Sequence, residues 1–266
     1  MDLVDRLRAA GCVFAEREAE LLRASPGDLE ELVARRVAGE RLEDVLGWAG
    51  FCGRRYAVTA GVFVPRHRSE ALVDLAAAHA RPGDVALDLC CGTGALIGAL
   101  TGRVPGLAVH ATDLNPAAVA CARRNLPGAH VHEGDLFAAL PPQLRGRFDV
   151  VIANVPYVPS AQIAHLPAEM REHEDRSTLD GGADGLDVLR RVLAEVGAWL
   201  SPRGRVFVEL DEDQTGPAVE FATRCGLRAQ VETTTVGDPG DPGDWGTETG
   251  HVLVVGPQVA MSTNRE

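Results

Sequence analysis

The feature that most constrains the fold is a regular alternation, from residue 69 to residue 257, of short apolar segments with segments of helical periodicity. Parallel neighbouring strands need a long crossover, usually a helix, so this alternation predicts an α/β protein with a doubly wound, mostly parallel sheet. The segments predicted as strands are 85–89, 107–113, 129–135, 148–154, 205–209, 227–233 and 251–255, and those predicted as helices are 69–79, 95–100, 116–125, 185–200 and 217–225.

The first fifty residues have a different pattern. Leu3, Leu7 and Ala10 recur at helical spacing, and Ser25 followed by proline predicts the capped start of a second helix. Glycines and short β-branched runs then predict a hairpin. The expected organisation is a helical domain over residues 1–50, a linking β-hairpin over 51–66, the α/β domain over 67–257 and a disordered tail over 258–266.

Composition narrows the class of protein. With 266 residues and 45% hydrophobic content, the chain can bury one large core with a small appendage. The net charge of −12 disfavours nucleic acid as the main partner, because such binding depends on basic surface. No apolar run approaches the roughly 18 residues of a membrane span, and the charged start predicts no secretory signal. The six cysteines form no CxxC pair, which favours reduced thiols in a cytoplasmic protein without a metal site.

A glycine-rich turn follows the first predicted strand of the α/β domain. In a doubly wound sheet, ligands bind outside the carboxyl ends of the strands. There the sequence places the carboxylate of Asp88, and then Gly92 and Gly94, which allow the backbone to approach a ligand closely. A Gly-x-Gly by itself is also common in ordinary turns.

Two acidic residues strengthen the ligand interpretation. Asp113 ends the second predicted strand, 21 positions after Gly92, where a carboxylate can accept both hydroxyls of a ribose. Asp135 follows the third strand and precedes Leu136 and Phe137, which suit the edge and face of an adenine.

The same turn disfavours phosphorylated ligands. A dinucleotide fingerprint needs glycine at the position of Ile97, and a Walker phosphate loop needs a lysine, which the sequence does not contain. A nucleoside without phosphates that carries a positive sulfonium fits better. We therefore expect S-adenosylmethionine as the cofactor, with Asp88 near its amino-acid part and Asp113 on its ribose.

The segment after the fourth predicted strand combines an amide, a stiff turn and an aromatic ring: Asn154-Val155-Pro156-Tyr157. The Asn154 oxygen and the Val155 carbonyl can each accept one hydrogen of a planar nitrogen group, and Tyr157 offers a face for stacking. Two preorganised acceptors would orient that nitrogen toward a methyl donor without a general base. The alternative is that the turn only ends a strand.

Together these motifs resemble the HemK/PrmC family, S-adenosylmethionine-dependent methyltransferases that act on a glutamine side-chain amide in peptide-release factors. The resemblance rests on the run from Asp88 to Gly94, on the turn from Asn154 to Tyr157, and on LDGGADGLDVLRRVL at 179–193. Residues 35–66 resemble that family's interdomain segment. The Asn-x-Pro-Tyr turn alone is shared with DNA adenine and ribosomal-RNA guanine methyltransferases.

The resemblance implies a seven-stranded sheet whose last strand is antiparallel, an amide clamp at Asn154 and Tyr157, and a release factor as partner, selected by the helical domain. Val155 and Pro156 complete the expected catalytic turn. The residues expected at the cofactor are Asp88, Cys90, Gly92, Gly94, Asp113, Leu114, Asp135, Leu136 and Asn154.

Two departures from the family pattern concern the acceptor. Val155 stands where the family has a first proline, and His67-Arg68-Ser69-Glu70 stands where it has Pro-x-Thr-Glu. Methylation of an amide or amine on a small molecule or natural-product peptide is therefore a second hypothesis. Nucleic-acid methylation and a non-enzymatic binding module with the same fold are two further alternatives.

Overall fold

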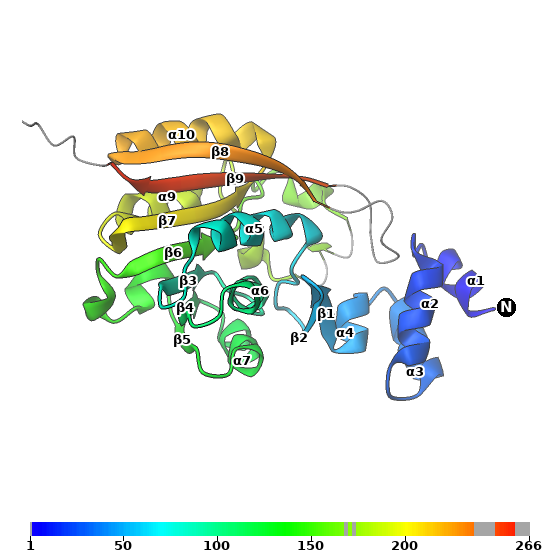
Figure 1. Ribbon diagram of the computed structural model, residues 1–266. Coiled ribbons are helices and arrows are strands. Elements are labelled where there is room, and N and C mark those ends of the chain that lie inside the picture. Colours follow the sequence, from blue (N-terminus) through cyan, green and yellow to red (C-terminus); the bar gives the residue numbers. More distant parts are fainter. Residues whose placement is uncertain (1, 168–169, 172–173, 237–247, 259–266) are drawn as a thin grey trace, which may run out of the picture.

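The computed structural model describes residues 2–167, 170–171, 174–236 and 248–258. Apart from residue 258, the tail expected at 258–266 lies outside these ranges. Helices α1–α3 lie at one end of the molecule, beyond the small hairpin, and the large sheet with its covering helices forms the rest (Figure 1). None of the helices within the described ranges is long and apolar enough to cross a membrane.

The large sheet confirms the predicted fold class. Its seven strands are in the order β5-β4-β3-β6-β7-β9-β8. Neighbours from β5 to β7 pair in parallel, whereas β9 is antiparallel to both β7 and β8. The strands are β3 (Val85–Leu89), β4 (Ala108–Asp113), β5 (His130–Glu133), β6 (Phe148–Ala153), β7 (Leu200–Leu210), β8 (Leu227–Val236) and β9 (Glu248–Pro257).

Helices cover both faces of this sheet (Figure 1), and each face has its own apolar core. Successive side chains of a strand point to opposite faces, so Ala86 packs with α5, α6 and α7 while Leu87 packs with α9 and α10. The helices are α5 (Glu70–His79), α6 (Ala95–Arg103), α7 (Pro116–Asn125), α9 (Asp187–Val196) and α10 (Thr215–Arg224). Short 3-10 turns are η1 (His67–Ser69), η2 (Leu136–Ala139), η3 (Pro142–Leu144), η4 (Ile163–His165), η5 (Arg176–Thr178) and η6 (Glu212–Gln214).

Strand β7 is longer than expected. Leu200 was assigned to the preceding helix, but it pairs with Phe148 of β6 as the first residue of β7. The pairing register shifts between Phe148 and Val150, a β-bulge that absorbs the extra residues of β7. Local periodicity does not reveal such a bulge.

The amino-terminal segment folds as helices α1 (Leu3–Ala9), α2 (Ala15–Ala24), α3 (Leu29–Val37) and α4 (Leu42–Leu46) around a separate apolar cluster. A hairpin of β1 (Trp48–Phe51) and β2 (Arg54–Ala57) follows. The prediction that Ser25 caps a helix was wrong. Ser25 ends α2, where its hydroxyl donates to the Leu21 carbonyl, and the Asp28 carboxylate caps α3 by accepting from the N–H groups of Glu30 and Glu31.

The order of the strands fixes where a ligand can bind. The chain moves outward from β3 to β4 and β5, and then returns to the other side of β3 with β6. The carboxyl ends of β3, β4 and β6 therefore face one crevice at the point where the strand order reverses.

Candidate active site

A cavity of about 780 Å³ lies at these carboxyl ends. Its walls come from the segment between β2 and α5, from the loops after β3, β4 and β5, from the turn after β6, and from described residues between 157 and 179, with further residues from α9 and from just after β7. Side chains along the cavity include Phe63, Arg66, Arg68, Cys90, Asp113, Leu114, Asp135, Leu136, Asn154, Tyr157, Gln162, Met170 and Asp211.

Asp113 is held by the backbone at the end of β4. Its carboxylate accepts from the N–H of Gly92 at 2.9 Å and from the N–H of Asn115 at 2.8 Å. Burial raises the pKa of Asp113, and these backbone donors oppose that rise. Each carboxylate oxygen keeps a further lone pair, so the group can accept hydroxyl donors from a ligand in the cavity.

The backbone along this side of the cavity is locally strained. Cys90 and Leu136 have φ of 57° and 46°, in the left-handed region that side chains other than glycine seldom adopt, and both line the cavity. Gly92 also has a positive φ, and a Cβ there would lie 3.4 Å from the Phe63 carbonyl oxygen. Strain of this kind is concentrated at functional sites, where the surrounding structure maintains it.

The apolar part of the cavity lies after β4 and β5. Leu114 is 65% exposed, which is unusual for a large apolar side chain, and Leu136 lies nearby in the same cavity. Asp135 also faces the cavity, and its carboxylate accepts from Arg191 at 2.5 Å. These residues offer an apolar surface with a carboxylate at its edge.

Two residues expected at the cofactor do not line the cavity. Asp88 is fully buried at the end of β3, and neither of its oxygens has a hydrogen bond of ordinary geometry to a described residue. Burial raises its pKa well above the usual value, and the N–H of Ile97 offsets this only in part. Gly94 is the cap that precedes α6, with φ of 75° in the left-handed region, and a Cβ there would lie 2.7 Å from a methyl carbon of Leu126. Backbone conformation and helix packing therefore account for this glycine.

The turn after β6 contributes two hydrogen-bond acceptors, the Asn154 amide oxygen and the Val155 carbonyl, from residues at the cavity. Asn154 and Val155 both line it. The Asn154 amide nitrogen donates to the Ser69 hydroxyl at 3.4 Å, so the amide oxygen takes no part in this hydrogen bond. Among the described residues, no hydrogen bond reaches the Val155 carbonyl or its N–H. Both oxygens are thus available to a ligand.

Tyr157 is held at both ends. Its hydroxyl accepts from Arg68, whose guanidinium carbon lies 5.3 Å from the ring centroid. Its carbonyl accepts from the Gln214 side-chain amide at 2.7 Å. A Cβ at Gly185 would lie 2.1 Å from this same carbonyl oxygen, so residue 185 must be glycine for the turn to pack there.

The LDGGADGLD run supports the turn from behind. Val158 donates to the Leu179 carbonyl and accepts from the Gly181 N–H, both at 2.9 Å, and the Ser160 N–H donates to the Gly182 carbonyl at 2.8 Å. The run therefore acts as a short backbone ladder that holds the residues after Tyr157.

Sequence reasoning missed the polar groups behind the turn. Arg68 and Ser69 each hydrogen-bond to Glu209, which is buried near the carboxyl end of β7. One signal was present: Glu209 interrupts an apolar strand, and a buried carboxylate needs a cationic or hydrogen-bonding partner. Those partners lie about 140 positions earlier in the chain, so the sequence could not identify them.

The residues of the cavity fit S-adenosylmethionine. The Asp113 carboxylate, already fixed by two backbone donors, has lone pairs left for ribose hydroxyls, and Leu114 and Leu136 provide an apolar surface for an adenine. The aspartates along the cavity suit a ligand that carries positive charge.

Comparison with known proteins agrees with this fit. A methyltransferase-domain family matches residues 86–174. A methyltransferase structure from Pyrococcus furiosus aligns with a TM-score of 0.52 and 18% identity, covering 84% of this chain and 95% of that one. A ribosomal protein L11 methylase from Lactobacillus delbrueckii aligns with a TM-score of 0.50 and 16% identity, over 75% and 83% of the two chains. The fold and site define an S-adenosylmethionine-dependent methyltransferase.

Sequence relatives narrow the class to a family. The release factor glutamine methyltransferase of Geobacter sulfurreducens is 39% identical over 74% of this chain and 69% of that protein. The protein of the same name from Bradyrhizobium diazoefficiens is 33% identical over 85% of each. The chain belongs to the release factor glutamine methyltransferase family.

Proposed function

We propose that this enzyme transfers a methyl group to the side-chain amide nitrogen of a glutamine in a peptide-release factor. The observation that carries the proposal is that Asn154 and Val155 both line the cavity, and that the described residues leave the Asn154 amide oxygen and the Val155 carbonyl without a hydrogen-bond partner. A primary amide has two N–H donors, which match these two acceptors. The names of the relatives support the choice of a release-factor glutamine.

The clamp addresses the poor nucleophilicity of an amide nitrogen. S-adenosylmethionine would supply an electrophilic methyl group on a sulfonium leaving group, and the amide nitrogen that takes up the methyl group would lose one of its two hydrogens as a proton to water. Asn154 and Val155 would hold both N–H bonds and stabilise the positive charge that develops on the nitrogen during attack. Fixing the nitrogen in the correct orientation removes most of the entropic part of the barrier. Tyr157, with Arg68 on its ring and hydroxyl, would form a rigid surface for the planar amide.

We assign the cofactor to the other side of the same cavity. In this proposal Asp113 binds the ribose hydroxyls, Leu114 and Leu136 contact the adenine, and Gly92 with Cys90 brings the backbone close to the ligand. Asp88 would support the loop from below, since it does not line the cavity.

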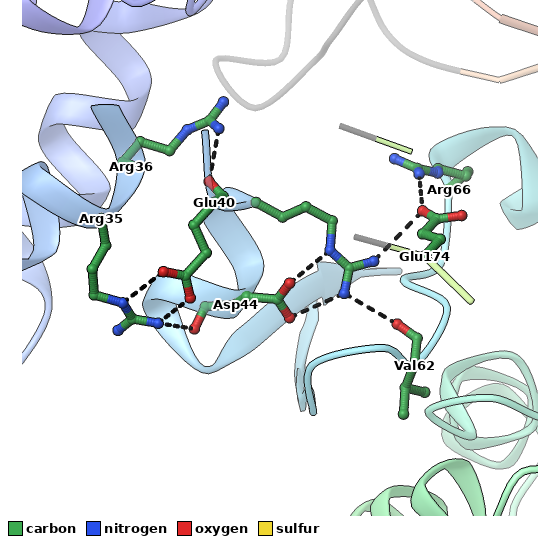
Figure 2. Close-up of polar contacts among 8 residues, drawn as sticks. Arg35, Arg36, Glu40, Asp44, Val62, Arg66 and Glu174 are labelled. Atoms are coloured by element: carbon green, nitrogen blue, oxygen red, sulfur yellow. Dashed lines mark hydrogen bonds and ion pairs between the residues drawn. The ribbon is translucent and has the colours of Figure 1, made fainter. Parts of the chain in front are cut away.

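The helical domain at residues 1–50 would select the acceptor. A buried ionic cluster connects it to the segment that borders the cavity (Figure 2). Arg41 pairs with Asp44 and lies 3.5 Å from an oxygen of Glu174, and that oxygen also accepts from Arg66 at 2.6 Å. Because Arg66 lines the cavity, this cluster would hold the helical domain in a fixed position relative to the active site. An acceptor bound on the helical domain would then lie in a defined position at the cavity.

The test is methyl transfer from labelled S-adenosylmethionine to purified release factor, with the labelled residue located by mass spectrometry. We expect one methyl group on one glutamine, and none on a release factor in which that glutamine is replaced by alanine. Transfer to small-molecule amides but not to release factor would favour the second hypothesis. No transfer to either class would contradict the proposed function.

A further inference from the structure

Two buried polar residues behind the turn from Asn154 to Tyr157 have no part in the chemistry described above. Ser69 is fully buried in η1, and Glu209 is 2% exposed in β7. The Ser69 hydroxyl lies 2.5 Å from one Glu209 oxygen and 3.4 Å from the Asn154 amide nitrogen. Ser69 therefore connects a buried carboxyl group to the side chain that would accept from the substrate.

The ionisation of Glu209 determines which group donates in each of these two hydrogen bonds. Burial raises the pKa of Glu209, while Arg68, which donates to it at 2.8 Å, and Ser69 act to lower that pKa and favour the carboxylate. A carboxylate can only accept, so Ser69 gives its single proton to Glu209. Ser69 can then only accept from Asn154, which means that the nitrogen of the Asn154 amide faces Ser69 and its oxygen faces the cavity.

We propose that Glu209 and Ser69 are positioning residues that fix the orientation of the Asn154 amide, so that its oxygen and not its nitrogen meets the acceptor. The two ends of an asparagine amide have nearly the same shape, and packing alone does not distinguish them. The role assigned to Asn154 rests on the proposed function; the orientation of its amide does not.

Replacing Glu209 with glutamine tests the proposal because it would reverse the direction of the hydrogen bonds from residue 209 through Ser69 to Asn154. Arg68 carries only donors, so it would attract the oxygen of the new amide and turn the nitrogen toward Ser69. Ser69 would then donate to Asn154 and turn the Asn154 nitrogen into the cavity. We expect Glu209→Gln to lower kcat roughly 100-fold, as expected for loss of a preorganised group, with cofactor affinity unchanged.

The Ser69→Ala variant provides the matched control. It removes the fixed orientation without imposing the wrong one, so we expect kcat to fall only about 5-fold, as for loss of one ordinary hydrogen bond. The double variant Glu209→Gln/Ser69→Ala lacks the hydroxyl that would donate to Asn154, so the glutamine cannot turn the Asn154 amide. We expect the double variant to be faster than Glu209→Gln and close to Ser69→Ala. A double variant as slow as Glu209→Gln, or slower, would overturn the proposal, because purely structural damage would accumulate.

A second measurement does not depend on the acceptor. The chain contains four asparagines, so the side-chain amide signals of protein labelled with ¹⁵N-asparagine can be assigned by substitution. We expect one Asn154 amide proton to exchange slowly with solvent in the native protein and faster in Glu209→Gln. Unchanged exchange would overturn the inference. Faster exchange in an enzyme that does not methylate release factor would refute the proposed function and leave this inference standing.

Discussion

Two carboxylates in this enzyme, Glu174 and Glu209, are buried next to arginines, but they are paired to different degrees. Both oxygens of Glu209 are hydrogen-bonded, one to Arg68 and one to Ser69. Glu174 uses one oxygen for both Arg41 and Arg66 (Figure 2), and its other oxygen is buried with no hydrogen-bond partner among the described residues.

This difference in pairing indicates two different roles: Glu174 holds segments of the protein together, whereas Glu209 orients a side chain. A buried ion pair costs a great deal to break, but a contact between charges tolerates small shifts. Complete hydrogen bonding imposes direction as well as distance. We therefore expect damage at Glu174 to appear mainly in stability and damage near Glu209 mainly in the rate of catalysis.

The largest effect should come from breaking the cluster at Glu174. Arg41 is 2% exposed and faces both Asp44 and Glu174. Arg41→Ala leaves two buried carboxylates without this cation, and we expect the free energy of unfolding to fall by about 3–5 kcal/mol. Denaturant unfolding followed by circular dichroism measures the loss. Arg23→Ala, at an exposed ion pair of 3.8 Å, is the control and should change stability little.

For substitutions in the turn from Asn154 to Tyr157, we expect a lower rate of methyl transfer. Asn154→Ala removes one preorganised acceptor, worth about 2.7–4 kcal/mol or roughly 100- to 1,000-fold in kcat. Asn154→Asp keeps an oxygen toward the cavity but sets another against Ser69, so its rate should fall between those of the native enzyme and Asn154→Ala. Single-turnover kinetics with a melting curve for each variant separate rate from folding. Near-native turnover in Asn154→Ala would refute the amide clamp.

A smaller effect is expected at the cofactor. Asp113→Ala should weaken S-adenosylmethionine binding by about 1.5–3 kcal/mol, because charge-assisted hydrogen bonds to the ribose are lost. Isothermal titration calorimetry measures the change. Unchanged affinity would remove Asp113 from the cofactor site.

The smallest effect is a pH dependence. Burial raises the folded-state pKa of Glu209, so as pH falls the native protein protonates this carboxylate at a higher pH than it would an exposed glutamate. Protonated Glu209 can donate, which would release Ser69 from its fixed direction and lower kcat on the acid side. Arg68 and Asp211 are the other charged groups facing Glu209, with opposing effects on that pKa. We expect this acid-side decline to be weaker in Ser69→Ala; an identical pH profile in that variant would argue against the link.

Much of the fold could be predicted because the local periodicity of apolar residues indicates the helices and strands. The ends of β3 and α7 are where the sequence placed them, since a short, mostly apolar segment before a glycine-rich turn and a proline-started helix are both local signals. The cap of α3 was misplaced, because Ser25 and Asp28 both suit a cap, and α2 extends to Ala24, which makes Ser25 its C-cap and leaves Asp28 to start α3.

The site was predictable only where a strand ends. Asp113 and Asn154 were expected at one crevice because the carboxyl ends of parallel strands meet at one edge of a sheet, and both line the cavity. The groups that orient them could not be found in this way. Glu209 meets Arg68 and Ser69 only after the chain has crossed the sheet, and the cluster at Glu174 joins residues more than 100 positions apart. Such pairings depend on tertiary structure.

The central claim is that the charge of Glu209 orients the Asn154 amide whereas the charge of Glu174 holds segments together. The most direct measurement compares Glu209→Gln with Glu174→Gln, the same change at both sites, by kcat for methyl transfer and by the free energy of unfolding. The account predicts roughly 100-fold lower kcat for Glu209→Gln and a loss mainly of stability for Glu174→Gln. Equal losses of kcat in the two variants, or a larger loss in Glu174→Gln, would contradict it.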